Sequence, residues 1–430
     1  MTAAATPTAV QYDRHRLDNG LRIVACQLQD TRAASARVFL DGGARVEPDD
    51  VAGVAHFLEH AVFKGTERWP TARELGLATE RFGGAADAFT DKDHSGFVVH
   101  GPADHLPLFL DVLADLVQRP VLRPEDVERE RAVIAEELRA YRDDSDDVAK
   151  TTLERSLWPR HPLGREIVGT SATIRRMTRD DLEAHRGRSF TPRGAVVSVA
   201  SSWPTARVFD EVGRAFADWR GDDPPRGRPA PPPPGGPLIS LQGRRAEQVR
   251  FRIGFPAPSR HEPHRHGLDI LATSLAGPAT SRLELRLREE LALVYDVSVS
   301  LEQYDDTGLI SVAAGVVGDK LAQALRATVA ELRDVRAGLP ADELSRVRDY
   351  LIGRWLCAEG TDFHASFAGR DEQVFGRPMS IEEEIASLRA VTLDEVRGLA
   401  ERLFRPERAL LAVVGPYHHS ATIHRILSGL

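Results

Sequence analysis

Two histidines and a glutamate stand close together in the segment GVAHFLEHAVFKGT, residues 53–66. His56 and His60 are four residues apart, so they share one face of a helix, and Glu59 borders that face. Imidazole nitrogens are zinc ligands, and a carboxylate that does not bind the metal can accept a proton from water. The segment therefore indicates either a metal site or an apolar helix whose histidines serve packing alone.

A second helical segment, PEDVERERAVIAEELRAYRDD, carries two acidic side chains on one face. Glu130 and Glu137 are seven residues apart and share that face with apolar residues. Such a face can direct a carboxylate toward whatever packs against it, although acids of this kind most often lie on a solvated surface. Two histidines, one glutamate and a water molecule form a known catalytic zinc site, in which a nearby unligated carboxylate takes the proton. Glu59 is suitably placed for that second role.

The overall composition excludes several classes of protein. The 430 residues carry a net charge of −8, which offers no basic surface for nucleic acid or for an anionic membrane. No stretch has the roughly 18 apolar residues of a membrane span, and residues 1–20 lack the apolar run of a signal peptide, so we expect a cytoplasmic protein. Cys26 and Cys357 are the only cysteines, so any metal must be held by nitrogen and oxygen.

The chain divides into two halves that resemble each other. The segment GDDPPRGRPAPPPPGGP, residues 221–237, predicts a stiff, extended linker between a domain at 1–220 and a domain at 238–430. Each half contains a helix that starts at a threonine, a turn with proline and an apolar strand. One copy begins at Thr178 and the other at Thr392, and they match without a gap at an offset of 214. This offset indicates two homologous domains in tandem.

The order of the sequence patterns predicts an α+β fold. The first half opens with the β-type segments LRIVACQL and ARVFLDGG, the second with LISLQG and QVRFRIGF, and longer helical patterns follow in both. We therefore expect each domain to contain a mainly antiparallel sheet packed against helices. This framework must position the histidine segment and the acidic segment if they act together.

The histidine segment also resembles a known family. GVAHFLEHAVFKGT is similar to the inverted zinc motif, His-x-x-Glu-His, of the pitrilysin and insulinase metallopeptidases, particularly their bacterial subfamily that is like the mitochondrial processing peptidase. In that family the third ligand is a glutamate 77 positions after the second histidine, which here is Glu137. The resemblance implies one Zn²⁺ ion per chain, held by His56, His60 and Glu137. It also implies that Glu59 is the general base and that Glu130 is a supporting acid.

Three further segments carry the resemblance. RHPLGREIVGT, residues 160–170, matches a His-Pro-Leu-Gly segment of the family. SRLELRLREELALVYDVSVS matches a segment whose arginine and tyrosine, here Arg288 and Tyr295, grip the substrate backbone, although by itself it is typical of an amphipathic helix that leads into a strand. Where the family commonly has Asn-Ala in a substrate-pairing edge strand, this chain has Asp87 and Ala88. The carboxylate either changes substrate preference or is tolerated as a near-isostere.

The resemblance implies a zinc-dependent endopeptidase that cuts peptides or unfolded segments, with precursor (leader) peptides among the candidate substrates. In the family, two halves of two domains each enclose the substrate, so we expect a homodimer or a heterodimer with a related peptidase-like subunit. The alternative is a non-catalytic structural or partner subunit of a larger assembly. Such relatives usually lose part of the metal set, and the glycine-rich loop of the non-catalytic subunit is missing from SLAGPATSR, residues 274–282.

Overall fold

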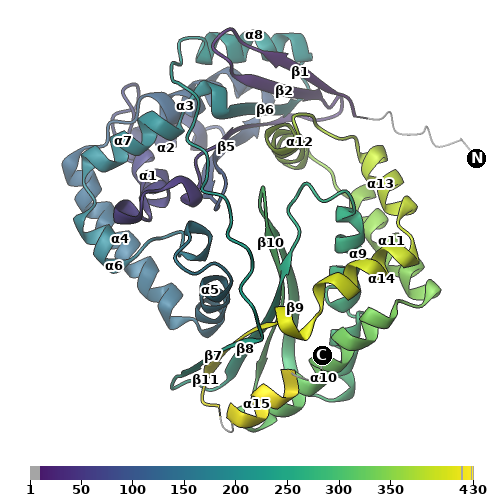
Figure 1. Cartoon of the computed structure of the whole chain (residues 1–430). Helices are drawn as coiled ribbons and strands as arrows, with labels where there is room; N and C mark the ends of the chain where they lie inside the picture. The colour runs from purple at the N-terminus through teal and green to yellow at the C-terminus, as the bar shows by residue number, and fades with distance from the viewer. Residues whose placement is uncertain (1–9, 418–419, 428, 430) are drawn as a thin grey trace, which may run out of the picture. The chain divides into compact units, whose positions relative to one another are not determined.

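The chain folds into two compact units, each built around one β-sheet. The computed structural model describes residues 10–417, 420–427 and 429. The first unit takes in the described residues of Met1–Glu136, Glu166–Arg228 and Trp355–Ile385, and the second takes in those of Glu137–Arg165, Pro229–Arg354 and Ala386–Leu430. Each unit therefore contains a segment from the opposite half of the chain (Figure 1).

The first unit holds a six-stranded sheet whose neighbouring strands are antiparallel, except for the parallel pair β2 and β6. In spatial order the strands are β1 (Tyr12–Arg16), β2 (Arg22–Gln27), β6 (Ala195–Ser201), β3 (Ala33–Leu40), β5 (Ser95–Pro102) and β4 (Ala85–Thr90). β6 is buried at every position, as expected for a strand covered on both faces. β4 forms one edge of the sheet.

Helices cover this first sheet. α3 and α8 pack across β2, β3 and β5, whereas α12, which comes from the second half of the chain, lies across β2, β3 and β6 (Figure 1). The helices of this unit are α1 (Val54–Val62), α2 (Ala72–Glu80), α3 (Leu106–Gln118), α6 (Ser171–Arg176), α7 (Arg179–Ser189), α8 (Thr205–Phe216) and α12 (Thr361–Phe375). Three helices span a boundary between the units: α4 (Pro124–Asp143), α11 (Ala341–Leu356) and α13 (Ile381–Ala390).

The second unit holds a five-stranded sheet. In spatial order its strands are β7 (Leu238–Gly243), β11 (Leu410–Gly415), β8 (Val249–Ala257), β10 (Gly308–Val316) and β9 (Val294–Gln303). α5 (Ser145–Leu157), from the first half of the chain, packs against β8 and β11. The other helices that lie wholly in this unit are α9 (Arg265–Leu275), α10 (Leu321–Ala337), α14 (Leu393–Leu403) and α15 (Ser420–Leu427).

The two units repeat one topology, which confirms the predicted α+β class and the tandem organisation. The order β2, β6, β3, β5, β4 in the first sheet corresponds to β7, β11, β8, β10, β9 in the second, and the first pair is parallel in both. Thr178 and Thr392 cap α7 and α14, because each side chain accepts a hydrogen bond from the backbone N–H three residues later. A proline turn and a buried strand follow each helix.

Some sequence expectations concern segments outside these elements. Residues 221–235 contain neither helix nor strand. Neither cysteine forms a disulfide. In the described part of the chain, every helix is too short or too polar to span a membrane. Residues 1–9, which form part of the segment behind the cytoplasmic expectation, lie outside the described residues.

Candidate metal centre

Helix α1 begins at a glycine that its surroundings require. Gly53 has a φ of 96°, and a Cβ atom on it would lie 2.5 Å from the carbonyl oxygen of Val168. The carboxylate of Glu47 accepts hydrogen bonds from the backbone N–H groups of Gly53 at 2.8 Å and Ala55 at 2.9 Å. These are donors that the first turn of a helix cannot pair internally. The start of α1 is therefore fixed by close packing against Val168 and by hydrogen bonds to Glu47.

The histidines of α1 lie side by side. Phe57 and Leu58 are fully buried and place the apolar part of the helix in the core. His56 is 8% exposed, and its ring centroid lies 4.6 Å from that of His60. The spacing of four residues thus brings the two imidazoles together on one face, with their ring planes tilted by 55°.

One further side chain reaches these imidazoles. Donor atoms of His56, His60 and Glu137 all lie within 4.8 Å of one another. Glu137 stands on α4, an uninterrupted helix of 20 residues, one residue past the boundary between the compact units. The structure therefore brings together the three residues that the family resemblance implies as ligands.

Glu130, two turns before Glu137 on α4, contacts His60 and Lys64. One of its oxygens lies 2.9 Å from His60 Nδ1, and the other accepts a hydrogen bond from Lys64 Nζ at 2.6 Å. Burial raises the pKa of this carboxyl, but the hydrogen bonds from His60 and Lys64 outweigh burial and hold the pKa of Glu130 below its usual value. An ionised Glu130 favours the proton of His60 on Nδ1, which directs Nε2 to a metal.

Glu59 contacts the last residue of the edge strand. Thr90 Oγ1 donates a hydrogen bond of 2.5 Å to Glu59 Oε2. This bond engages one carboxylate oxygen and fixes the orientation of the side chain. Glu59 is adjacent in sequence to His60, so the orientation is set next to the histidine pair.

Asp87 and Ala88 lie on β4, at the edge of the first sheet. Asp87 is exposed, and its Oδ1 accepts a hydrogen bond of 2.8 Å from the backbone N–H of Ala88. Ala88 is opposite Phe97 in the register with β5. Both residues therefore lie on the strand that the family resemblance associates with substrate.

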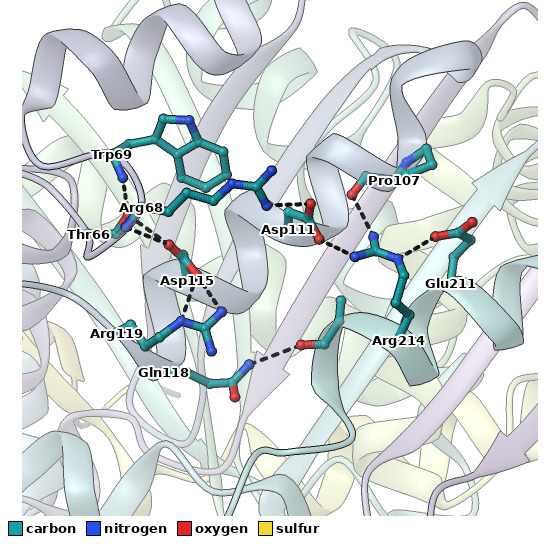
Figure 2. Close-up of polar contacts among 11 residues, drawn as sticks. Thr66, Arg68, Trp69, Pro107, Asp111, Asp115, Gln118, Arg119, Glu211 and Arg214 are labelled. Carbon is teal, nitrogen blue, oxygen red and sulfur yellow. Dashed lines mark hydrogen bonds and ion pairs between the residues drawn. The ribbon is translucent and has the colours of Figure 1, made fainter.

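A buried aspartate of α3 holds the loop that leaves α1 (Figure 2). Asp115, 2% exposed, accepts hydrogen bonds through Oδ2 from Thr66 Oγ1 at 3.0 Å and from the backbone N–H of Arg68 at 3.3 Å. Its Oδ1 accepts two more from the guanidinium of Arg119, at 2.5 and 2.8 Å. Thr66 Oγ1 in turn accepts from the N–H of Trp69 at 3.1 Å.

The same loop is joined to the turn that leads into α4. The N–H of Val121 donates to the carbonyl of Gly65 at 3.0 Å, and the N–H of Glu67 donates to the carbonyl of Arg119 at 3.0 Å. Asp115 binds both the loop and Arg119. It therefore fixes the exit of α1 relative to the entrance of α4, the two helices that carry the candidate ligands.

Arg288 and Tyr295 lie together in the second unit. Arg288 belongs to a π-helical segment, Glu284–Glu290, and Tyr295 follows on β9. The guanidinium lies 5.8 Å from the centroid of the Tyr295 ring, and Tyr295 is 79% exposed. Glu284 lies 3.6 Å from Arg288 Nη1. Both side chains are thus presented on the surface of that unit.

The donor set around His56 fits zinc. Two imidazole nitrogens and one carboxylate oxygen are a catalytic zinc set, and a site of three protein ligands leaves one position for water. A carboxylate on the second nitrogen of a ligating histidine is the usual outer-shell partner, and Glu130 supplies it to His60. The described residues hold one such cluster of histidine and acidic donors.

Sequence reasoning missed Lys64, Thr90 and Asp115. Lys64 was detectable, because it is four residues after His60 and eight after His56, in the turn that directly follows α1, so the helical spacing brings it next to the histidine face. Thr90 and Asp115 carry no such signal, because each reaches the site only through tertiary packing.

Two family models together match most of the chain. Residues 22–171 match the family described as Insulinase (Peptidase family M16), and residues 176–351 match the Peptidase M16 inactive domain. A Mycobacterium leprae protein named as an uncharacterized zinc protease is 34% identical over 423 residues, 96% of this chain and 94% of that protein. An Arabidopsis thaliana protein, "Probable mitochondrial-processing peptidase subunit beta, mitochondrial", is 26% identical over 417 residues, 93% of this chain and 77% of that protein.

A solved structure shares the fold. A protease from Helicobacter pylori superposes with a TM-score of 0.88 at 19% identity, covering 95% of this chain and 100% of the other. The mycobacterial relative matches nearly the whole chain, and the family matches include the helices that carry His56 and Glu137. This chain therefore belongs to the insulinase family of peptidases, peptidase family M16.

Proposed function

We propose that this protein is a zinc-dependent endopeptidase with one zinc ion per chain, held by His56, His60 and Glu137. The observation that carries the proposal is the convergence of these three donors beside Glu59. Zinc in such a site supplies Lewis-acid chemistry that makes water acidic near neutral pH. The complete donor set and the presence of Glu59 favour a catalytic subunit over the non-catalytic alternative.

Glu59 is the general base in this proposal. It takes a proton from water as the water oxygen adds to the carbonyl carbon of the peptide bond, and it passes that proton to the leaving amine nitrogen as the C–N bond breaks. Thr90 holds the carboxylate in one orientation during both transfers. Glu130 keeps His60 in the tautomer and orientation that a ligand needs.

The substrates are extended peptides or unfolded segments, including precursor (leader) peptides. A peptide pairs with the backbone of β4 near Asp87 and Ala88, because this edge strand can accept a further strand. Arg288 and Tyr295 bind the substrate backbone, for which an exposed guanidinium and phenol supply hydrogen-bond donors.

The active assembly is a homodimer, or a heterodimer with a related peptidase-like subunit, in the cytoplasm. The chain carries both the metal set and the pair Arg288 and Tyr295, so two copies contain every element that the mechanism uses. This argument favours the homodimer.

The test uses the purified chain beside a Glu59→Gln variant. We would measure zinc per chain, the mass in solution and the cleavage of a mixed pool of unstructured peptides. Zinc-dependent cuts that the variant lacks support the proposal. A zinc-loaded chain that cuts nothing in either oligomeric state favours the partner-subunit alternative, and a chain that takes up no zinc refutes the mechanism.

A further inference from the structure

The hairpin of β4 and β5 determines which backbone groups face the open edge. The N–H of Asp91 donates to the carbonyl of His94 at 2.7 Å, so these residues form a hydrogen-bonded pair next to the turn. In an antiparallel ladder such pairs alternate with pairs whose N–H and C=O groups point away from each other. Counting back along the register, Phe89 is bonded to β5, whereas Ala88, opposite Phe97, directs its N–H and C=O outward.

The side chain of Asp87 is hydrogen-bonded to the outward N–H group of Ala88. Its Oδ1 accepts the N–H of Ala88 at 2.8 Å, and the side chain is exposed. A peptide that adds to β4 needs the same N–H for one of its carbonyl oxygens. The carboxylate therefore takes the place of a substrate carbonyl, and it must swing aside before a strand can pair here.

The capped donor lies close to the proposed base. Thr90, two residues after Ala88, holds Glu59 through its hydroxyl. At a rise of about 3.3 Å per residue, Ala88 and Thr90 are about 7 Å apart along the strand. A peptide residue that pairs at Ala88 is therefore within about two or three residues of the bond beside Glu59.

We propose that Asp87 selects peptides that carry a lysine or arginine within three residues of the cleaved bond. This inference rests on the proposed function. Once displaced from Ala88, the carboxylate stands against the substrate backbone and has only acceptor atoms to offer. A basic side chain gives it a new, charge-assisted partner, whereas an acidic side chain at the same position repels it.

The experiment compares peptides that differ only in one residue, lysine, glutamine or glutamate, placed either within three residues of the cleaved bond or at least six residues away. Native protein should favour the nearby lysine over glutamate by about fivefold in kcat/KM, the factor expected for an exposed ion pair. Asp87→Asn removes the charge and should bring that ratio close to one. Asp87→Ala also uncaps Ala88 and should in addition raise kcat/KM for the glutamine peptide.

Binding to the Glu59→Gln variant, with and without Asp87→Asn, separates this inference from the proposed function. If the peptides bind with a charge preference that Asp87→Asn abolishes, but the native chain does not cut them, the role of Asp87 is supported and the proposed peptidase activity is refuted. Cleavage with equal ratios in native, Asp87→Asn and Asp87→Ala proteins overturns the role of Asp87 and leaves the peptidase standing. Peptides that are neither cut nor bound overturn both.

Discussion

The two repeats of the chain build sheets of the same topology, yet among the described residues only the first repeat brings together donor atoms that could hold a metal ion. α1 packs against α7 in the first repeat as α9 packs against α14 in the second. α9 has one histidine, His266, and the residue four positions later is the buried Ile270. The repeated fold therefore sets where the helices stand, and a few side chains decide whether they can hold a metal.

The counterpart of α4 shows the same contrast. α11 carries the mostly buried Glu343, which binds Arg282 through both oxygens at 2.9 and 2.7 Å. That bidentate pair uses the carboxylate for structure, and it holds the pKa of Arg282 above its usual value in spite of burial. In the first repeat, Glu130 contacts His60 with one oxygen and Lys64 with the other.

Removing a ligand from the first repeat should have the largest effect. Glu137→Gln keeps the size of the side chain but replaces a carboxylate ligand by an amide, so we expect zinc to fall from about one per chain to a small fraction, and cleavage to fall by at least about 1,000-fold. His266→Ala, which removes the histidine of α9, is the control in the second repeat. Metal analysis after dialysis checks both, and equal zinc losses in the two variants would contradict the contrast between the repeats.

Glu130→Gln should have the next largest effect. The amide keeps a hydrogen bond but cannot stabilise the His60 tautomer as a carboxylate does, so zinc affinity should fall by about 10- to 100-fold. Competition with a chelator of known affinity measures this change. Glu128→Gln is the control, because Glu128 is on the same helix and pairs with Arg131 instead. An unchanged affinity in Glu130→Gln would show that Glu130 has no supporting role.

The exchanged helices α5 and α12 allow a second comparison, because both dock through ion pairs. Arg14 of β1 binds the buried Glu372 of α12 at 2.7 and 2.9 Å, and the buried Arg252 of β8 binds Asp146 of α5 at 2.8 Å. Arg14→Met should lower the free energy of unfolding by about 2 kcal/mol, because Glu372 is left buried without its main partner. Urea denaturation measures this loss.

A matched pair of variants sharpens the test of α12. In the double variant Arg14→Met with Glu372→Met, no buried charge is stranded, so most of the lost stability should return. A double variant as unstable as the single one would mean that Arg14 stabilises the unit by packing its stem and not by pairing with Glu372. The corresponding single and double variants of Arg252 and Asp146 measure how much their ion pair stabilises the docking of α5.

The elements of the fold were predictable wherever their signals are local. The sequence alone predicts the threonine caps of α7 and α14, the proline turns and the apolar strands. The offset of 214 shows that these elements form a repeat. The exchange of α5 and α12 was not predictable. An amphipathic pattern shows that a helix covers something, but it does not show which of two similar sheets it covers.

The site divides in the same way. His56 and His60 followed from helical spacing, because four residues bring two side chains onto one face. Glu137 had no local signal that set it apart from Glu130, and only the family resemblance separated them. Thr90 and Asp115 act through contacts between segments that are 31 and 49 residues apart, so no pattern along the chain could reveal them.

The smallest predicted effect concerns a position at which the repeats differ inside their cores. His185 of α7 is 1% exposed, its Nε2 has no hydrogen-bond partner among the described residues, and the matching residue at the offset of 214 is the buried Leu399. Burial, assisted by the nearby charge of Arg188, lowers the pKa of His185 to about 4, against a hydrogen bond with the Gly42 backbone. His185 therefore binds a proton at a lower pH in the folded chain than in the unfolded chain.

The sign of the effect follows from that difference. Near pH 7.5 both states hold His185 neutral, but below a pH of about 6.5 the unfolded state binds a proton that the native state binds only near pH 4, so stability falls as the pH falls. Between pH 7.5 and 5 the native chain should lose about 2 kcal/mol more than His185→Leu, which copies the second repeat. Urea denaturation across this range measures both slopes. If the free energy of unfolding changed with pH equally in the native chain and in His185→Leu, the folded chain would bind a proton at His185 as readily as the unfolded chain does. Burial of this histidine would then not set it apart from the leucine of the second repeat.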